Sequence, residues 1–286
     1  MKTAYITDSG TGYSMDFMAK KGIFSLPLQI EINGKNYFDL EQITNNEVLE
    51  CLRRDDKIST SLPSLGLIDD LIKKIKEQGF DNIIAVPICN GLSGTINALN
   101  MTAHQYLIPI KCIDNYVTAE LERYLIEFIK DSREHNVDDE AIFKTVDEII
   151  DSANTILVPD SLAHLSKSGR LTPMAAGIGD FFNIKPILEI NKRTNGRIDV
   201  SSKVRTFKKA LTKANEIMLK EIDTNNRYDI YIAHVDAYDK AVKFKANIET
   251  QFANADIHII PLCSPVAIHT GLGCIAIQYF KKKTLY

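Results

Sequence analysis

The stretch Asn82-Ile-Ile-Ala-Val-Pro-Ile-Cys-Asn-Gly-Leu-Ser-Gly-Thr95 decides the fold of the first half of the chain. Its apolar run predicts a short strand, its glycines predict a tight loop, and the pattern after Thr95 predicts a helix. Such a loop lies outside the carboxyl end of a sheet strand, where α/β proteins usually bind ligands. Ser93 and Thr95 offer hydroxyl groups beside the free N–H groups of a helix N-terminus, which favour an anion. The stretch therefore predicts a receptor for a small negative group, either phosphate or carboxylate.

Strand and helix signals alternate around this stretch as far as about residue 155. Asn33-Gly34 is a strong hairpin signal, and Thr44-Asn-Asn-Glu47 predicts a capping box that opens a short helix. Strands that alternate with helices favour a parallel sheet covered on both faces. We therefore predict an α/β fold class for the chain, with an N-terminal α/β/α domain and a parallel sheet over residues 1–155.

A second stretch rich in hydroxyl groups is Ile58-Ser-Thr-Ser-Leu-Pro-Ser64. Pro63 disfavours a helical conformation at the residue before it, and Ser64 is a natural N-cap for the helical pattern that follows. The stretch therefore predicts a loop. It serves either as a simple turn and cap, or as a ligand-binding loop that uses Thr60 or Ser61.

The second half of the chain mixes hairpin signals with helical patterns. Thr194-Asn-Gly-Arg197 is a turn signal between two strand patterns. This mixture predicts an α+β domain with a largely antiparallel sheet over residues 156–286. A chain of 286 residues is long enough for two domains of this size.

Composition and charge exclude several classes of protein. The net charge of −3 argues against a nucleic-acid-binding protein that works by charge alone. The five cysteines form no C-x-x-C pair and no metal spacing, which is typical of reduced thiols in the cytosol. The N-terminus has no apolar signal-peptide core, and no run approaches the ~20 apolar residues that span a bilayer. We therefore expect a cytoplasmic protein without a metal site.

A histidine and two arginines are further candidates for contact with an anion. His269 precedes a glycine-rich turn, Arg170 follows a glycine, and Arg205 ends a strand pattern. A carboxylate in an apolar cleft needs at least one donor of this kind. Surface solvation is the alternative interpretation of both arginines, and His164, which lies in a helical pattern, is interpreted as a packing residue.

Two enzyme alternatives remain open. Ser93 and His269 are candidates for a serine hydrolase that acts on acyl esters, although Thr95 stands where the nucleophile elbow has glycine. A phosphate-ligand binder or kinase-like enzyme would use the helix N-terminus near Ser93, but the chain lacks a Walker A motif. A dinucleotide fingerprint at residues 271–276 lies too close to the C-terminus to open a βαβ unit, and we reject it.

Seven short motifs, in this order and spanning nearly the whole chain, resemble the DegV family. They are Ile6-Thr-Asp-Ser9, Thr60-Ser-Leu-Pro-Ser64, Gly91-Leu-Ser-Gly-Thr95, Ser168-Gly-Arg170, Ile184-Lys-Pro-Ile187, Lys203-Val-Arg205 and His269-Thr-Gly271. The chain departs from the family pattern at Leu62, often Gln, at Ser168, often Gly, and at Leu272, usually Pro. These departures leave the hydroxyl groups and His269 in place.

The resemblance implies a DegV-like two-domain protein that binds one long-chain fatty acid in a cleft between its domains. Such proteins are non-catalytic binding subunits of bacterial fatty acid kinase and carry no cofactor beyond the bound acid. They present the carboxylate to a separate ATP-dependent kinase subunit, and the acyl phosphate then enters phospholipid synthesis. Transient contact with a membrane surface accompanies this role.

The same resemblance implies the residues of the site. Thr60 or Ser61, together with Ser93 and His269, would hold the carboxylate. Arg170 and Arg205 would lie nearby for the head group or for kinase docking, and Thr95 is a further polar neighbour. The small and aromatic residues at 175–184 are candidates for the lining of a tunnel for the acyl chain.

Overall fold

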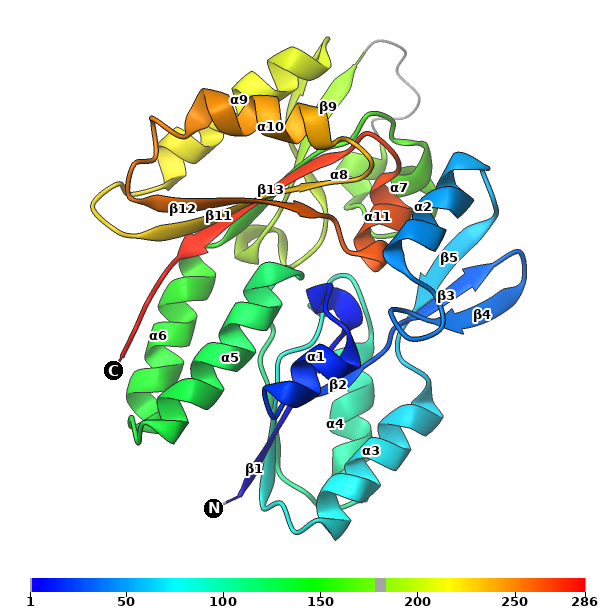
Figure 1. Cartoon of the computed structure of the whole chain (residues 1–286), viewed down its shortest axis with the longest axis vertical. Helices are drawn as coiled ribbons and strands as arrows, with labels where there is room; N and C mark the ends of the chain where they lie inside the picture. The colour runs from blue at the N-terminus through cyan, green and yellow to red at the C-terminus, as the bar shows by residue number, and fades with distance from the viewer. Residues whose placement is uncertain (1, 178–183, 286) are drawn as a thin grey trace. The chain divides into compact units, whose positions relative to one another are not determined.

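The structure is a computed structural model that describes residues 2–177 and 184–285 (Figure 1). The chain forms two compact units. The first runs to Asn136 and includes Cys263–Pro265, and the second comprises the other described residues. The division that we predicted at residues 155/156 falls inside a strand of the second unit. As functional domain limits, 1–155 and 156–286 stay predictions.

The first unit contains the predicted parallel sheet, with strand order β2-β1-β6-β7 and parallel pairing throughout. Its strands are β1 (Thr3–Asp8), β2 (Phe24–Leu26), β6 (Asn82–Ala85) and β7 (Ile110–Cys112). Its helices are α1 (Met15–Lys20), α2 (Asn45–Arg53), α3 (Leu65–Glu77), α4 (Thr95–Gln105) and α5 (Glu120–Glu134). Side chains alternate across a strand, so the two faces of β1 meet different helices.

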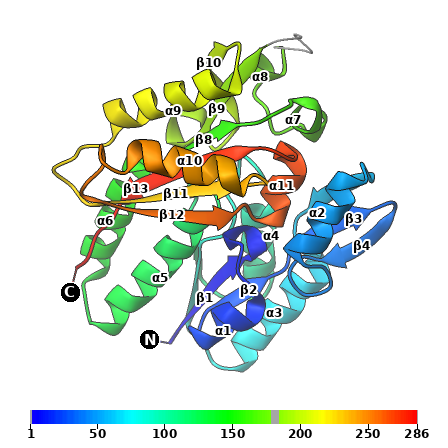
Figure 2. The same cartoon turned by 45° about the horizontal axis from the view of Figure 1, so that its top comes forward.

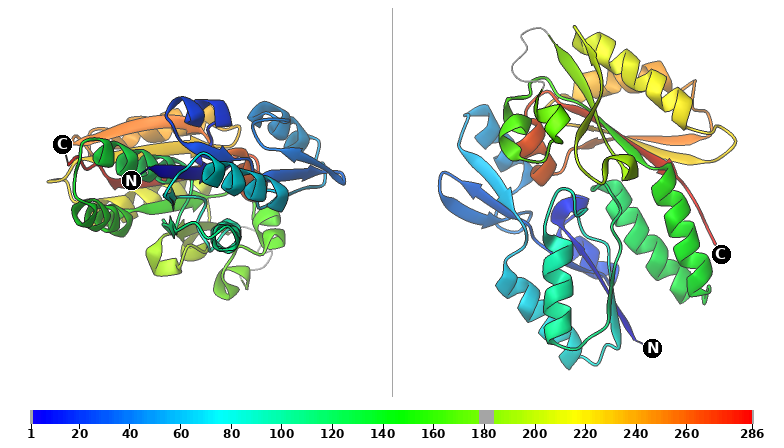
Figure 3. Two further views of the ribbon diagram at one scale, coloured as in Figure 1. Left: turned by 90° about the horizontal axis from the view of Figure 1, so that it is seen from below. Right: turned by 180° about the vertical axis from the view of Figure 1, so that it is seen from behind.

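Helices cover both faces of this sheet, as the alternation of strands and helices predicted. Ala4 and Ile6 of β1 share one apolar core with Ile72 of α3 and Leu99 of α4. Thr7 points to the opposite face, where its hydroxyl bonds α5. Figure 3 shows α4 and the sheet strands from the opposite side to Figure 1.

A small antiparallel sheet with order β4-β3-β5 belongs to the same unit. Its strands are β3 (Gln29–Ile32), β4 (Lys35–Phe38) and β5 (Ile58–Ser61). The predicted hairpin at Asn33 and Gly34 is confirmed, because both residues have positive φ angles, 50° and 85°. The loop predicted at residues 58–64 is wrong for its first part, since residues 58–61 pair with β3 as a strand. Extended backbone with hydroxyl side chains fits a sheet edge as well as a loop, and only the partner strand decides between them.

The second unit contains a six-stranded sheet with order β10-β9-β8-β13-β11-β12. Only the β11–β12 pair is parallel, which confirms a largely antiparallel sheet. The strands are β8 (Asn154–Val158), β9 (Lys185–Ile190), β10 (Asp199–Val204), β11 (Tyr228–His234), β12 (Ala255–Pro261) and β13 (Ile275–Lys281). Strands β9 and β10 form the hairpin predicted around Asn195 and Gly196.

In the described part of the second unit, five α-helices pack against the sheet or connect its strands, and a sixth, α11, starts in the first unit. They are α6 (Asp139–Ser152), α7 (Ala163–Ser168), α8 (Pro173–Ala176), α9 (Phe207–Glu221), α10 (Tyr238–Ile248) and α11 (Ser264–Thr270). Helices α9 and α10 lie over one face of the sheet (Figures 1 and 2). Their buried residues, among them Met218 and Phe244, share a core with Ile230, Ile232 and Ile277 of the central strands.

We predict that Thr44→Ala destabilises the first unit by about 1 kcal/mol, because it removes the N-cap of α2. The backbone N–H of Glu47 donates to Thr44 Oγ1, and the Glu47 carboxylate accepts the Thr44 N–H at 2.8 Å, so the predicted capping box is confirmed. Urea unfolding measures the change. Thr212→Ala on an exposed face of α9 is the control and should change stability by no more than about 0.5 kcal/mol. Equal effects of the two substitutions would contradict the role of the cap.

Candidate functional site

The topology of the first unit places a switch point between β1 and β6. From β1 the chain crosses to β2 on one side, and it then returns to β6 on the other side of β1. Ligands of open α/β sheets bind outside the carboxyl ends of the strands at such a point. The segment after β6 carries the loop at residues 90–95, which we call the Ser93 loop. The fold therefore supports the position that the sequence predicted for an anion site.

Two hydroxyl groups of the Ser93 loop are brought together. Ser93 Oγ lies 2.9 Å from Thr95 Oγ1, and the backbone N–H of Ser93 donates to Cys89 O at 3.1 Å. One hydroxyl proton lies between the two oxygens, so the other is left to donate to a further acceptor. Helix α4 begins at Thr95, and no side chain caps its N-terminus at Gly94. Hydroxyl and backbone donors are thus available for the same anion.

Thr60 and Ser61 lie on opposite faces of β5, because side chains alternate along a strand. Thr60 is half-buried and pairs with the buried Ile30 of β3, whereas Ser61 is exposed. Ser61 Oγ accepts a hydrogen bond from Gln29 Nε2 at 3.2 Å. Only one of these two hydroxyl groups can therefore face a given ligand. The helix-capping role predicted for Ser64 is only partly fulfilled, since Ser64 is the N-cap of α3 but its side chain makes no capping bond.

Basic side chains gather in the second unit around His269, the penultimate residue of α11. The pKa of His269 is lowered to about 4, first by burial and then by the charges of Arg170 and His164. Burial also lowers the pKa of Arg170, whose guanidinium donates to Ser168 O. His269 is therefore neutral at pH 7 and still able to donate one N–H. An anion would relieve the repulsion among these groups.

His164 is the residue of this cluster that the sequence did not indicate as part of a site. Its ring lies against the backbone of Gly271, so it packs as predicted, but it packs next to His269. A helical pattern gives no signal for a partner more than 100 positions away in the chain. Arg205 follows β10 and is exposed. Of the predicted tunnel lining, residues 178–183 lie outside the described residues, and Ala175 in α8 is buried.

The hydrolase alternative gains no support from this arrangement. The hydrogen-bond partner of the Ser93 hydroxyl is the hydroxyl of Thr95, which cannot act as a general base. The rejected dinucleotide fingerprint is also rejected by the fold, because residues 271–274 connect α11 to β13 and open no helix. Within residues 2–177 and 184–285, no cluster of three metal-ligating side chains occurs.

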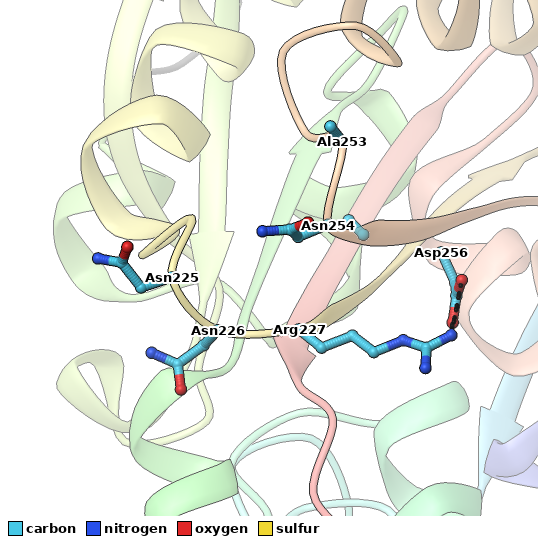
Figure 4. A pocket seen from close by; sticks show the side chains of 7 residues that line it. Asn225, Asn226, Arg227, Ala253, Asn254 and Asp256 are labelled. Carbon is cyan, nitrogen blue, oxygen red and sulfur yellow. Dashed lines mark hydrogen bonds and ion pairs between the residues drawn. The ribbon is translucent and has the colours of Figure 1, made fainter.

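A surface hollow of about 430 Å³ in the second unit differs from the candidate anion site in the groups that it offers to a ligand. It is lined by Asn225, Asn226, Arg227, Ala253, Asn254, Ala255 and Asp256. Figure 4 shows Arg227 and Asp256 pointing toward each other, and their ion pair measures 2.9 Å. Because the one arginine of the lining is already paired with a carboxylate, the hollow offers little to an anion.

None of the helices in the described parts of the chain is both long and apolar enough to cross a membrane.

We predict that Gly271→Ala destabilises the second unit more than Gly169→Ala. Both glycines have φ near +70°, at 76° and 69°, which strains any other residue. A Cβ at Gly271 would lie 2.7 Å from His164 Cδ2, whereas at Gly169 no atom lies within 4 Å. Thermal unfolding of both variants measures the difference. In the double variant with His164→Ala, part of the loss should be recovered, and equal losses in all three proteins would contradict the packing of His164 on this turn.

Comparison with known proteins places the chain among relatives of the same length. DegV domain-containing protein YqaC of Lactococcus lactis is 28% identical over 285 residues, which covers 99% of this chain and 100% of the relative. DegV domain-containing protein M5005_Spy0672 of Streptococcus pyogenes serotype M1 is 30% identical over 278 residues, covering 96% and 98%.

Solved structures agree with this assignment. The crystal structure of fatty acid binding DegV family protein SAG1342 from Streptococcus agalactiae matches with a TM-score of 0.89 at 28% identity, covering 99% of this chain and 100% of that one. DegV, described as a fatty acid binding protein from Bacillus subtilis, shares the fold with a TM-score of 0.86 at 21% identity, covering 99% and 100%. The model of the family described as "Uncharacterised protein, DegV family" matches residues 2–282. The chain therefore belongs to the DegV family.

Proposed function

We propose that this protein binds a long-chain fatty acid and presents the carboxylate to a separate ATP-dependent fatty acid kinase subunit. The observation that carries the fatty acid is the likeness to the Streptococcus agalactiae protein, whose description states fatty acid binding. That likeness covers both chains almost completely at a TM-score of 0.89. The kinase partner is inferred from the resemblance of the seven motifs.

The chemistry of the candidate site supports a carboxylate ligand. Burying a fatty acid tail contributes roughly 0.8 kcal/mol per CH2, so the tail supplies most of the affinity. A carboxylate that follows the tail out of water must find several hydrogen-bond donors. The Ser93–Thr95 hydroxyl pair offers such donors. The resemblance of the motifs adds Thr60, His269 and Arg170 as further candidates.

Among the candidates for the carboxylate, we favour Thr60 over Ser61. Thr60 is half-buried, whereas the side chain of Ser61 is exposed, and a hydrogen bond shielded from water contributes more to binding. Arg205 is exposed beyond β10 and is the better candidate for contact with a kinase subunit than for the head group.

In this proposal the protein is a carrier without catalysis of its own. The chain has no Walker A motif, and the Ser93 hydroxyl has no base as its partner. The kinase subunit would bind ATP and transfer the γ-phosphoryl group of ATP to the presented carboxylate, releasing ADP. The acyl phosphate would then feed phospholipid synthesis, with transient membrane contact for exchange of the acid. Incubation of this chain alone with ATP and oleate should give no acyl phosphate.

Fatty acid binding is tested with purified protein and with its Ser93→Ala variant. Native mass spectrometry should show a mass increment equal to one fatty acid, and delipidated protein should take up one oleate. Ser93→Ala should weaken oleate binding by about tenfold to about a hundredfold, because it removes a hydrogen bond to a charged group worth about 1.5–3 kcal/mol. The control is Ser59→Ala, which removes an exposed hydroxyl of β5.

Protein that is consistently free of lipid and takes up no oleate would contradict the proposed function. Unchanged affinity in Ser93→Ala, with normal binding by the wild type, would instead remove only Ser93 from the site.

We also predict that bound oleate raises the pKa of His269. Without ligand this pKa is lowered to about 4, below the value near 6.5 of an unfolded chain, so falling pH destabilises the second unit below about pH 6.5. A nearby carboxylate favours the protonated imidazole. Titration of the His269 ring resonances by NMR, with and without oleate, measures the shift, and the resonances of the exposed His104 serve as the control. An identical His269 titration in both samples would place the carboxylate elsewhere.

A further inference from the structure

Two buried carboxyl groups meet at the switch point of the first unit. Asp8, the last residue of β1, and Glu122, in the first turn of α5, are both fully buried. Burial raises the pKa of both groups, to about 6 for Asp8, and no lysine or arginine of the described chain is among the causes that shift either one. Two unpaired carboxylates side by side in an apolar interior would repel each other and lack hydration. At neutral pH the pair therefore keeps a proton.

The hydrogen bonds around Glu122 indicate where this proton resides. Thr7 Oγ1 lies 2.9 Å from both Glu122 Oε1 and the carbonyl oxygen of Val86. Thr118 Oγ1 lies 3.0 Å from Glu122 Oε2 and 3.2 Å from the carbonyl oxygen of Gly10. Each hydroxyl has one proton, and a carbonyl can only accept. The two hydroxyls can donate to only two of these four oxygens, so Glu122 receives no donor when both hydroxyls donate to the carbonyls. Glu122 is therefore poorly placed to stay ionised.

Asp8, by contrast, is surrounded by donors. The backbone N–H of Gly10 donates to Asp8 Oδ1 at 2.8 Å, and the N–H of Ile88 donates to Asp8 Oδ2 at 3.1 Å. The hydrogen bond with Glu122 lowers the pKa of Asp8 and raises the pKa of Glu122. Ionised Asp8 and neutral Glu122 are thus the forms that this environment favours.

Asp8 links the segment after β1 to the segment that carries the Ser93 loop. Ile88, its donor, precedes Cys89, whose carbonyl oxygen accepts the N–H groups of Leu92 and Ser93 at 3.0 and 3.1 Å. Two hydrogen bonds, joined by the covalent backbone of Ile88 and Cys89, therefore connect the Asp8 carboxylate to Ser93. The pair also leaves no room at Gly10, where a Cβ would lie 2.7 Å from Asp8 Oδ1 and 2.8 Å from Glu122 Oε2.

We propose that Asp8 and Glu122 hold one proton between them, on Glu122, and that the ionised Asp8 positions the Ser93 loop for the ligand. Both are positioning residues, because they act through the backbone of Ile88 and Cys89. The predicted effects on oleate binding rest on the proposed function, whereas the location of the proton does not.

The pair makes the first unit less stable as pH rises. The folded state holds a proton that the unfolded chain releases above about pH 4, so stability is lost as pH rises through the raised pKa values. Other titratable groups face the pair, namely Asp39 beside Asp8 and Cys89 near Glu122. Burial raises the pKa of Asp39 to about 7, which gives the same trend. The pH dependence of the free energy of unfolding in the wild type alone therefore does not identify the Asp8–Glu122 pair. A variant of one member is needed to separate the effect of the pair from that of Asp39.

Glu122→Gln and Asp8→Asn separate the two roles. Glutamine keeps a neutral side chain that can donate, so Glu122→Gln should bind oleate within about twofold of the wild type. It should also lose less stability between pH 6 and pH 9, because no proton has to be held. Asparagine offers one acceptor oxygen to two N–H donors, so Asp8→Asn should bind oleate about tenfold more weakly.

The matched control is Glu120→Gln, on the same helix. Glu120 is also buried, but its carboxylate forms an ion pair with Arg123 at 2.8 Å and accepts from the Tyr13 hydroxyl. Glu120→Gln should lower stability at pH 6 and at pH 9. The difference in the free energy of unfolding between the two pH values should stay as in the wild type.

Hydrogen exchange adds a readout that needs no ligand. The amides of Leu92 and Ser93 should lose protection between pH 6 and pH 9, after correction for intrinsic rates, in the wild type but not in Glu122→Gln.

A Glu122→Gln protein as damaged as Asp8→Asn, or one with the pH dependence of the wild type, would overturn the inference. If Asp8→Asn does not fold, the Glu122→Gln and hydrogen-exchange results decide it alone. A wild type that binds no oleate would contradict the proposed function, whereas the stability and exchange measurements would still test the proton and the link to the Ser93 loop.

Discussion

The hydrogen bonds of the buried Asp8 carboxylate are the constraint that joins the loops after β1 and β6 in the first unit. An ionised group in an apolar interior persists only when donors surround it. Asp8 takes its donors from the backbone of Gly10 and of Ile88, and therefore fixes the segments after β1 and β6 against each other. These two strands flank the switch point of the sheet. The need to satisfy one carboxylate thus shapes the place where an α/β sheet binds its ligand.

The second unit is held together differently, by a large apolar core and one polar network at its margin. The hydroxyl of Tyr279 in β13 donates to Glu221 at the end of α9, and Asn154 of β8 donates to both of them. Arg193 pairs with the same carboxylate at 2.7 Å. The network therefore ties β13 to β8 and to the end of α9. Strand β13 itself begins at Ile275, shortly after the glycine turn that follows His269.

Much of the fold follows from local patterns in the sequence. The hairpin at Asn33 and Gly34 and the capping box at Thr44 each depend on residues within a few positions of one another. The parallel sheet pairs distant strands, but the alternation of local strand and helix patterns was enough to predict it. The assignment of residues 58–61 to a loop failed, because their strand exists only by pairing with β3.

The predicted site residues divide in the same way. The Ser93–Thr95 pair depends on one loop and was visible in the sequence, whereas the contact of His164 with Gly271 joins α7 to a turn more than 100 positions away in the chain. Glu122 gave no signal at all, because a glutamate in a helix pattern is usually exposed and only the tertiary fold buries it. Local motifs therefore predict the groups that would meet a ligand, and the groups that hold the Ser93 loop in place emerge only from the packing.

A crystal structure of the protein with oleate tests the account most directly. We predict that one carboxylate oxygen lies about 2.5–3.0 Å from Ser93 Oγ, the distance of an O–H···O hydrogen bond. Density for the carboxylate at any place away from the Ser93 loop would contradict the account.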